Sequence, residues 1–148
     1  LGMYEKILTA GWGDMDFNAH MRNTAYLDKS VDVRMMYFAE NGLPMSEFIR
    51  LKIGPVVMKD EIEYFKEFHL LEEMRVTHSL AGMSNDGSRA RVRNEFFKHE
   101  KLAARVTSTL GWLDLNERKL ILPPGKLFAA LQGMDKTEDF QILPDKRT

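Results

Sequence analysis

The stretch that decides how this chain folds reads Asp14-Met15-Asp16-Phe17-Asn18-Ala19-His20-Met21-Arg22-Asn23 and leads directly into residues 24–41, TAYLDKSVDVRMMYFAEN. The second segment contains neither glycine nor proline, and its apolar side chains recur at helical spacing. This pattern predicts a long helix with a buried face. Asn41-Gly42, followed by Pro44, predicts its end. A polar decapeptide therefore stands immediately before a helix N-terminus.

The decapeptide concentrates groups suited to acid–base chemistry. Asp16 can activate water or attack a carbonyl directly, and Asn18 can hold the water or the carbonyl. His20 can orient the aspartate or carry a proton, although a loop-fixing hydrogen bond to backbone explains it equally well. The first N–H groups of a helix have no intrahelical partner and form its positive end. A carbonyl placed there would meet a proton acceptor and oxyanion donors together.

Plainer explanations apply to parts of this motif. Asn23 or Thr24 is expected to be the helix N-cap, and Asp14 could shape the loop or cap the helix. An EF-hand calcium loop is excluded, because Ala19 and Ala25 occupy the positions that require Gly and Glu.

The spacing of the motif resembles a known signature. Asp16-x-Asn18-x-His20-x-x-Asn23-x-x-Tyr26, preceded by Trp12-Gly13-Asp14, is similar to the signature of hotdog-fold acyl thioesterases. The similarity extends to the 4-hydroxybenzoyl-CoA thioesterase-like group and to the plant acyl-ACP thioesterases. It implies functional roles for Asp16, Asn18 and His20. Departures from the common residues of the signature are Ala19 for Gly, Met21 for Val and Arg22 for Asn.

Glu67 resembles a further catalytic glutamate of the plant enzymes. The alternation of residues 56–68 predicts a strand that would place Glu67 on the same face as Glu61 and Glu63. That position favours an ordinary solvent-exposed role for Glu67.

Further residues are candidates for binding the substrate. The backbone N–H groups of residues 21–24 are expected to form the oxyanion site, so the predicted substrate contacts are Met21, Arg22, Asn23, Thr24 and Tyr26. Arg89, Arg91 and Arg93 alternate onto one strand face and could bind the phosphates of CoA. A solvated strand face paired with acidic neighbours explains this basic row as well.

The composition excludes several classes of site. The chain has no cysteine, so disulfides, thiolate metal sites and a cysteine nucleophile are absent. His69, His78 and His99 show no ligand spacing and are expected to be surface or structural residues, so we predict no metal and no cofactor.

The charge and the hydropathy limit the partners and the location. A net charge of −1 argues against nucleic-acid binding. The apolar runs are too short to span a bilayer. No signal peptide is evident, and the start at Leu1-Gly2 lacks an initiator Met, so the true start is expected to be trimmed or left unrecorded. We expect a cytoplasmic protein.

The remaining pattern predicts an α+β chain with one domain over residues 1–148. Strands are expected at 3–11, 56–68, 74–81, 89–98 and 102–115, with Asn85-Asp86-Gly87 as a hairpin turn. Short helices are expected at 45–52 and 126–131, followed by a frayed tail. The resemblance implies a hotdog domain, in which an antiparallel sheet wraps around one long central helix, and a homodimer that shares its active sites.

The resemblance therefore implies a hydrolase of acyl-CoA or acyl-ACP thioesters, with a role in fatty acid metabolism. A hotdog hydratase or dehydratase is one alternative, although the motif fits thioesterases better. A non-catalytic module that binds acyl thioesters is another, but binding alone does not require a carboxylate beside the carbonyl.

Overall fold

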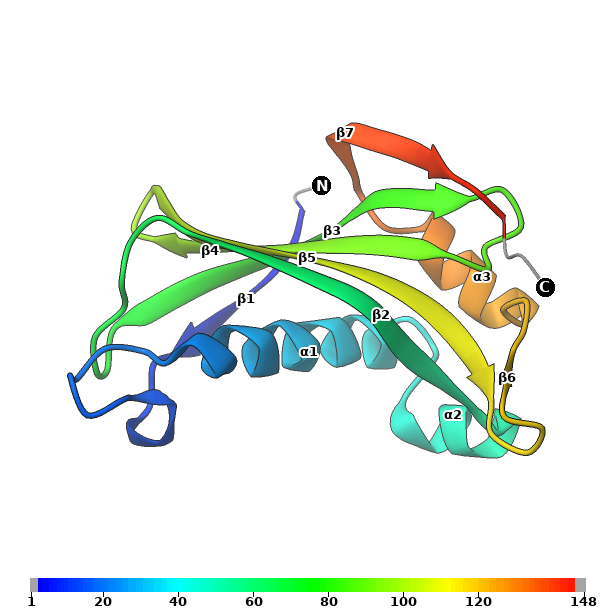
Figure 1. The fold of residues 1–148 in the computed structure, drawn as a ribbon, viewed down its shortest axis with the longest axis horizontal. Helices are drawn as coiled ribbons and strands as arrows, with labels where there is room; N and C mark the ends of the chain where they lie inside the picture. The colour runs from blue at the N-terminus through cyan, green and yellow to red at the C-terminus, as the bar shows by residue number, and fades with distance from the viewer. Residues whose placement is uncertain (1–2, 146–148) are drawn as a thin grey trace.

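Helix α1 (Asn23–Glu40) lies along the inner side of a curled, seven-stranded sheet (Figure 1). The structure is a computed structural model that describes residues 3–145. The other elements are β1 (Tyr4–Thr9), η1 (Trp12–Asp14), α2 (Met45–Leu51), β2 (Ile53–Tyr64), β3 (Glu73–Ser84), β4 (Ala90–Lys98), β5 (Lys101–Asp114), β6 (Lys119–Leu120), α3 (Gly125–Gln132) and β7 (Lys136–Leu143).

The sheet has the order β1-β3-β4-β5-β2, so β1 and β2 lie at opposite edges. β6 adds to β5, and β7 pairs with the second half of β3. All pairs are antiparallel except β3–β7, which is parallel. The β3–β4 hairpin turns where the Asn85-Asp86-Gly87 sequence predicts it, with Gly87 at φ 76°.

The core forms where α1 packs on the sheet. Tyr37 and Phe38 of the helix belong to the same buried cluster as Trp112 of β5. Two polar side chains anchor this cluster: the Tyr37 hydroxyl donates to the Ala130 carbonyl at 2.6 Å, and Trp112 Nε1 donates to the Gly87 carbonyl at 2.8 Å. Ala25, Tyr26 and Val33 of the same helix belong to a second buried cluster, so α1 packs against the sheet along its length.

The α+β prediction is confirmed, and the expected long helix is the longest of three helices in the described part of the chain, with 18 residues. The expected N-cap is wrong, because Arg22 occupies that position and makes no side-chain cap bond. The expected frayed tail is also wrong over residues 136–143, which form β7. Leu1 and Gly2, which bear the expectation of a trimmed or unrecorded start, lie outside the described residues.

The strand predicted over 56–68 ends earlier than expected. β2 stops at Tyr64, and residues 65–72 form a linker to β3. The strand prediction for Glu67 is therefore wrong, although its side chain is exposed to solvent, as expected. Between residues 3 and 145, no helix has the length and apolar character needed to cross a membrane.

Candidate active site

The motif loop closes on itself through Asp16. Its carboxylate Oδ1 accepts hydrogen bonds from the backbone N–H groups of Asn18 at 2.9 Å and His20 at 3.2 Å. The backbone adds a bond from Asp16 N–H to the His20 carbonyl at 2.8 Å. Ala19 completes the turn in the left-handed region, at φ 66°, which glycine adopts more readily than alanine. Asp16 thus fixes the turn that presents His20.

Two charged side chains attach this loop to α1. Asp14 bonds Lys29 of α1 at 2.9 Å and accepts from the Gly11 N–H at 2.8 Å. Burial acts to raise the pKa of Asp14, but these two contacts outweigh it and hold the pKa below its usual value. Arg22 donates to the Gly13 carbonyl and to the Thr24 hydroxyl. Asp14 and Arg22 therefore shape the loop.

The linker between β2 and β3 docks against the motif loop. Met21 N–H donates to the Phe68 carbonyl at 3.0 Å, and His20 forms an isolated antiparallel bridge with His69. The Phe68 side chain is fully buried, which anchors the linker in the core. Residues two apart in an extended segment point to the same side. This arrangement brings Glu67 and His69 together beside His20.

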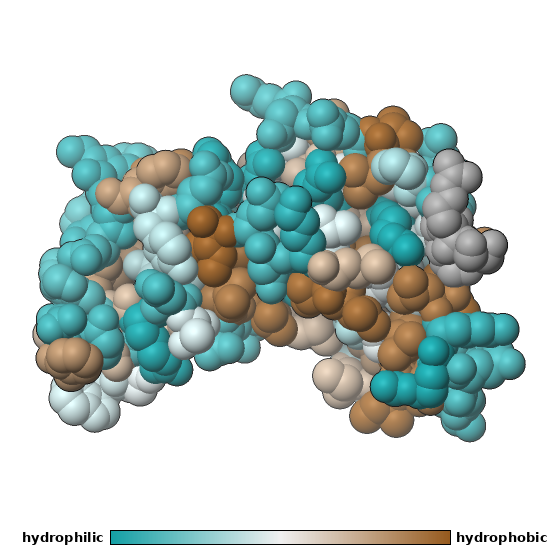
Figure 2. All heavy atoms as spheres, in the orientation of Figure 1, coloured by the Kyte–Doolittle hydropathy of each residue, from teal (hydrophilic) through white to brown (hydrophobic). Residues whose placement is uncertain are grey.

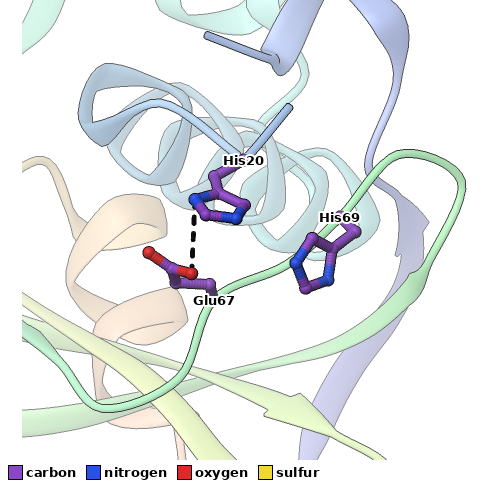
Figure 3. A group of neighbouring side chains, drawn as sticks. All are labelled: His20, Glu67 and His69. Atoms are coloured by element: carbon purple, nitrogen blue, oxygen red, sulfur yellow. Dashed lines mark ion pairs between the residues drawn. The ribbon is translucent and has the colours of Figure 1, made fainter. Parts of the chain in front are cut away.

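Figure 3 shows that the side chains of His20, Glu67 and His69 point toward one another. His20 Nδ1 lies 3.3 Å from Glu67 Oε2, and the His20 and His69 rings are 5.0 Å apart between centroids. His69 is exposed, as expected of a surface residue, but its place beside His20 and Glu67 was not predicted. The spacing Glu67-x-His69 was the available signal, because residues two apart share a face of an extended segment. The sequence does not show that this face lies against His20.

Glu67 borders two adjoining hollows. One, of about 290 Å³, lies beside the start of α1 and is lined by Met21, Asn23, Tyr26, Tyr64, Phe65, Lys66 and Glu67. The other, of about 600 Å³, is lined by Lys66, Glu67, His69, Lys98, His99, Glu100 and Lys101. Neither lining includes Asp16, Asn18 or His20. Of the two carboxylates in the predicted catalytic set, Asp16 and Glu67, Glu67 is the one that lines these hollows.

Tyr26 separates the first hollow from the core. It is buried and makes edge contacts with Tyr64 and Phe96, with ring centroids 5.3 and 5.4 Å apart. Burial raises the pKa of the Tyr26 hydroxyl to about 12, so the group stays protonated at neutral pH.

The predicted oxyanion donors are reduced to two. Met21 N–H is bonded to the Phe68 carbonyl and Arg22 N–H to the Asp14 carbonyl at 2.8 Å, so neither can serve. The amides of Asn23 and Thr24 belong to the first turn of α1, where a helix supplies no acceptor.

The predicted phosphate-binding arginines lie apart from the motif loop. Arg93 forms an ion pair with Asp139 of β7 at 2.9 Å, and Arg91 donates to Gln141 of the same strand. Arg89 donates to the Ser88 carbonyl. None of the three lines either hollow beside Glu67.

Comparison with known proteins gives one family. A family model described as the thioesterase-like superfamily matches residues 10–131. Among curated sequences, none matches significantly.

Solved structures share the fold at low sequence identity. A Staphylococcus aureus protein in complex with CoA aligns with a TM-score of 0.79 at 17% identity, covering 90% of this chain and 86% of that chain. A 1,4-dihydroxy-2-naphthoyl-CoA thioesterase from Synechocystis aligns with a TM-score of 0.79 at 16% identity, covering 89% of this chain and 97% of that chain. A gentisyl-coenzyme A thioesterase aligns with a TM-score of 0.78 at 16% identity, covering 86% of this chain and 99% of that chain.

These matches agree with the resemblance carried by the motif at Asp16–Tyr26. The family match spans the motif loop, α1, and the linker that bears Glu67. This chain belongs to the thioesterase-like superfamily.

Proposed function

We propose that this protein hydrolyses acyl-CoA thioesters to a carboxylic acid and free CoA thiol. The observation that carries the proposal is the 3.3 Å contact between His20 and Glu67, at the border of the two hollows. Membership in the thioesterase-like superfamily supports it. Further support comes from the similar structures, of which two are thioesterases of aromatic acyl-CoA compounds and a third holds CoA.

In the proposed reaction, Glu67 is the general base. It removes a proton from a water molecule that attacks the thioester carbonyl. His20, whose Nδ1 lies 3.3 Å from Glu67 Oε2, orients the carboxylate. The CoA thiolate then leaves without strong acid assistance, because a thiol has a pKa of about 8.5.

The negative charge on the tetrahedral intermediate needs donors beside the water. The N–H groups of Asn23 and Thr24 are proposed to supply them, since Asn23 lines the same hollow as Glu67. They stand at the positive end of α1. Losing one such donor typically costs about 3 kcal/mol of transition-state stabilisation.

Asp16 is proposed as a positioning residue. Its Oδ1 holds the turn that carries His20, and an asparagine could accept the same two backbone hydrogen bonds. A base or nucleophile at position 16, as the sequence motif predicts, would instead require the carboxylate itself.

The charge around the larger hollow suits the CoA part of the substrate. Lys66, Lys98 and Lys101 line it beside Glu67 and Glu100, so ammonium groups outnumber carboxylates there, and Lys98 is also paired with Glu72. Phosphates bind favourably beside ammonium groups. Acyl carrier protein presents the same thioester, so it remains a second possible acyl carrier to be compared in the assay.

A homodimer is part of the proposal. β2 is an edge strand of 12 residues, and Val57, Met58 and Tyr64 on it are more than two-fifths exposed. Figure 2 shows apolar surface gathered over the middle of the molecule, along the course of β2 and α1. The same strand, β2, carries four exposed charged residues, Lys59, Asp60, Glu61 and Glu63, so its exposed apolar part is short. The unpaired backbone groups of an edge strand are what a second strand can cover. Pairing of two β2 strands would cover them, as the family resemblance implies.

The test is release of free thiol from a panel of aromatic and aliphatic acyl-CoAs and the matching acyl-ACPs, followed with a thiol reagent. Glu67→Gln should reduce kcat by at least about a hundredfold. Asp16→Asn should keep most of the activity, whereas Asp16→Ala should lose kcat with little change in KM, because the turn opens.

The outcomes separate the possible functions. An inactive Asp16→Asn beside an active Glu67→Gln would leave hydrolysis in place but move the base to Asp16. Hydration of an enoyl-CoA without thiol release would indicate a hydratase. Tight acyl-CoA binding with neither reaction would indicate a binding module and would refute the proposal.

A further inference from the structure

The cluster of His20, Glu67 and His69 has the composition of a metal site. Each of the three side chains offers one ligand atom, and these atoms lie within 4.8 Å of one another. Two imidazoles and a carboxylate suit zinc or another divalent transition metal, whereas calcium and magnesium prefer oxygen ligands alone.

The backbone holds the three ligands before any metal arrives. His20 and His69 face each other across the isolated bridge, and Met21 N–H fixes the neighbouring Phe68 carbonyl at 3.0 Å. Phe68 is buried between the two linker ligands, Glu67 and His69. The ligands therefore stand on two backbone segments joined to each other, rather than on independent loops.

A second observation concerns the orientation of His69. Glu72 Oε1 accepts a hydrogen bond from the His69 backbone N–H at 2.6 Å and lies 3.0 Å from its Nδ1. Glu72 is itself held by Lys98 at 3.0 Å. Metal-bound histidines almost always donate their second ring N–H to a carboxylate or carbonyl, which fixes the tautomer. With Nδ1 occupied in this way, Nε2 of His69 is the nitrogen that can ligate.

We propose that His20, Glu67 and His69 bind one zinc ion or a similar divalent transition metal, and that this ion inhibits the enzyme. Three protein ligands leave a fourth position of a tetrahedral site for water. Binding would occupy both His20 and Glu67, so the base could no longer activate water. The inhibitory part rests on the proposed function, while metal binding does not depend on it.

Metal binding is measured first, on EDTA-treated wild-type protein, by titration calorimetry with zinc chloride and by the visible spectrum with cobalt. We expect one site per chain and a cobalt spectrum typical of tetrahedral coordination. His69→Gln should weaken zinc binding by about tenfold or more, and Glu72→Gln should weaken it by about ten- to a hundredfold. His99→Asn is the matched control, because His99 lines the same hollow outside the cluster.

Thiol release from acyl-CoA then tests inhibition. Zinc should inhibit the wild type and His99→Asn, and EDTA should reverse the effect. Whatever activity His69→Gln has without zinc, it should keep the same fraction of that activity at zinc concentrations that inhibit the wild type. Zinc binding that is equal in the wild type and His69→Gln, or that is absent in both, would overturn the site. If no acyl-CoA is hydrolysed, the proposed function fails and the titrations still decide whether the metal site exists.

Discussion

Acidification should weaken the fold through one buried histidine. His78 of β3 is 1% exposed, and the Asn94 amide Nδ2 lies 2.9 Å from its Nδ1. An amide nitrogen can only donate, so Nδ1 accepts and the ring is neutral, with its proton on Nε2. Burial first, and then the charge of buried Arg34, lower the pKa of His78 to about 3.

The sign and size of the effect follow from proton linkage. The unfolded chain protonates this histidine near its ordinary pKa of about 6.5, while the folded chain resists protonation down to about 3. Stability is therefore unaffected by His78 above about pH 6.5 and is lost as the pH falls below it. At pH 4.5, two pH units below the pKa of the unfolded chain, the free energy of unfolding has fallen by about 2.7 kcal/mol, at about 1.36 kcal/mol per pH unit.

The assay is urea denaturation at pH 7 and pH 4.5, at equal protein concentrations, for the wild type and His78→Gln. Because carboxylates also titrate in this range, the quantity to compare is the loss between the two pH values. Between pH 7 and pH 4.5, the free energy of unfolding of His78→Gln should fall by about 2.7 kcal/mol less than that of the wild type, whatever the stability of the variant at pH 7. His99→Asn should lose as much as the wild type. Equal losses in His78→Gln and the wild type would refute the burial argument.

Two further predictions concern the hairpin turn and the edge strand. Gly87→Ala should lower the free energy of unfolding by about 2–4 kcal/mol in urea denaturation, because φ at Gly87 is +76° and the new Cβ would lie 2.5 Å from Phe128. An unchanged free energy of unfolding would contradict the close packing of Gly87 against Phe128. The double substitution Val57→Lys/Met58→Lys should give a monomer in sedimentation, because it places charge on the edge strand β2 that the dimer would pair. Ile7→Lys, on the opposite edge strand β1, should leave the dimer intact. A monomeric wild-type protein would refute the proposed dimer.

The sequence predicted the elements that have a buried face of their own. Residues 24–41 were expected to be helical, and α1 spans Asn23–Glu40. β7 was missed because, of its eight residues, only Leu143 is buried, so the segment shows no alternation. β7 is placed by its parallel pairing with β3, which is distant in the sequence. A pairing between distant segments cannot be predicted from the local pattern of residues.

The candidate site was predicted only in part for a similar reason. Asp16, Asn18 and His20 lie in one short motif, so their proximity was readable from the chain. Glu67 and His69 lie beside His20 only because the linker of residues 65–72 packs against the motif loop. The sequence does not indicate this contact, because the apolar Phe68 fits the alternation of a strand over residues 56–68. The Phe68 side chain is instead buried to hold the linker beside the loop.

The contacts that place the proposed catalytic groups are separate from the groups themselves. Backbone bonds join His20 and Met21 to the linker, and Asp16 closes the turn with an oxygen that an amide can replace. Substitutions at His20 or Glu67 should therefore remove chemistry without moving either segment. Loss of function in Glu67→Gln with an unchanged fold would then report on chemistry alone, and the same loss in Asp16→Ala would report on geometry.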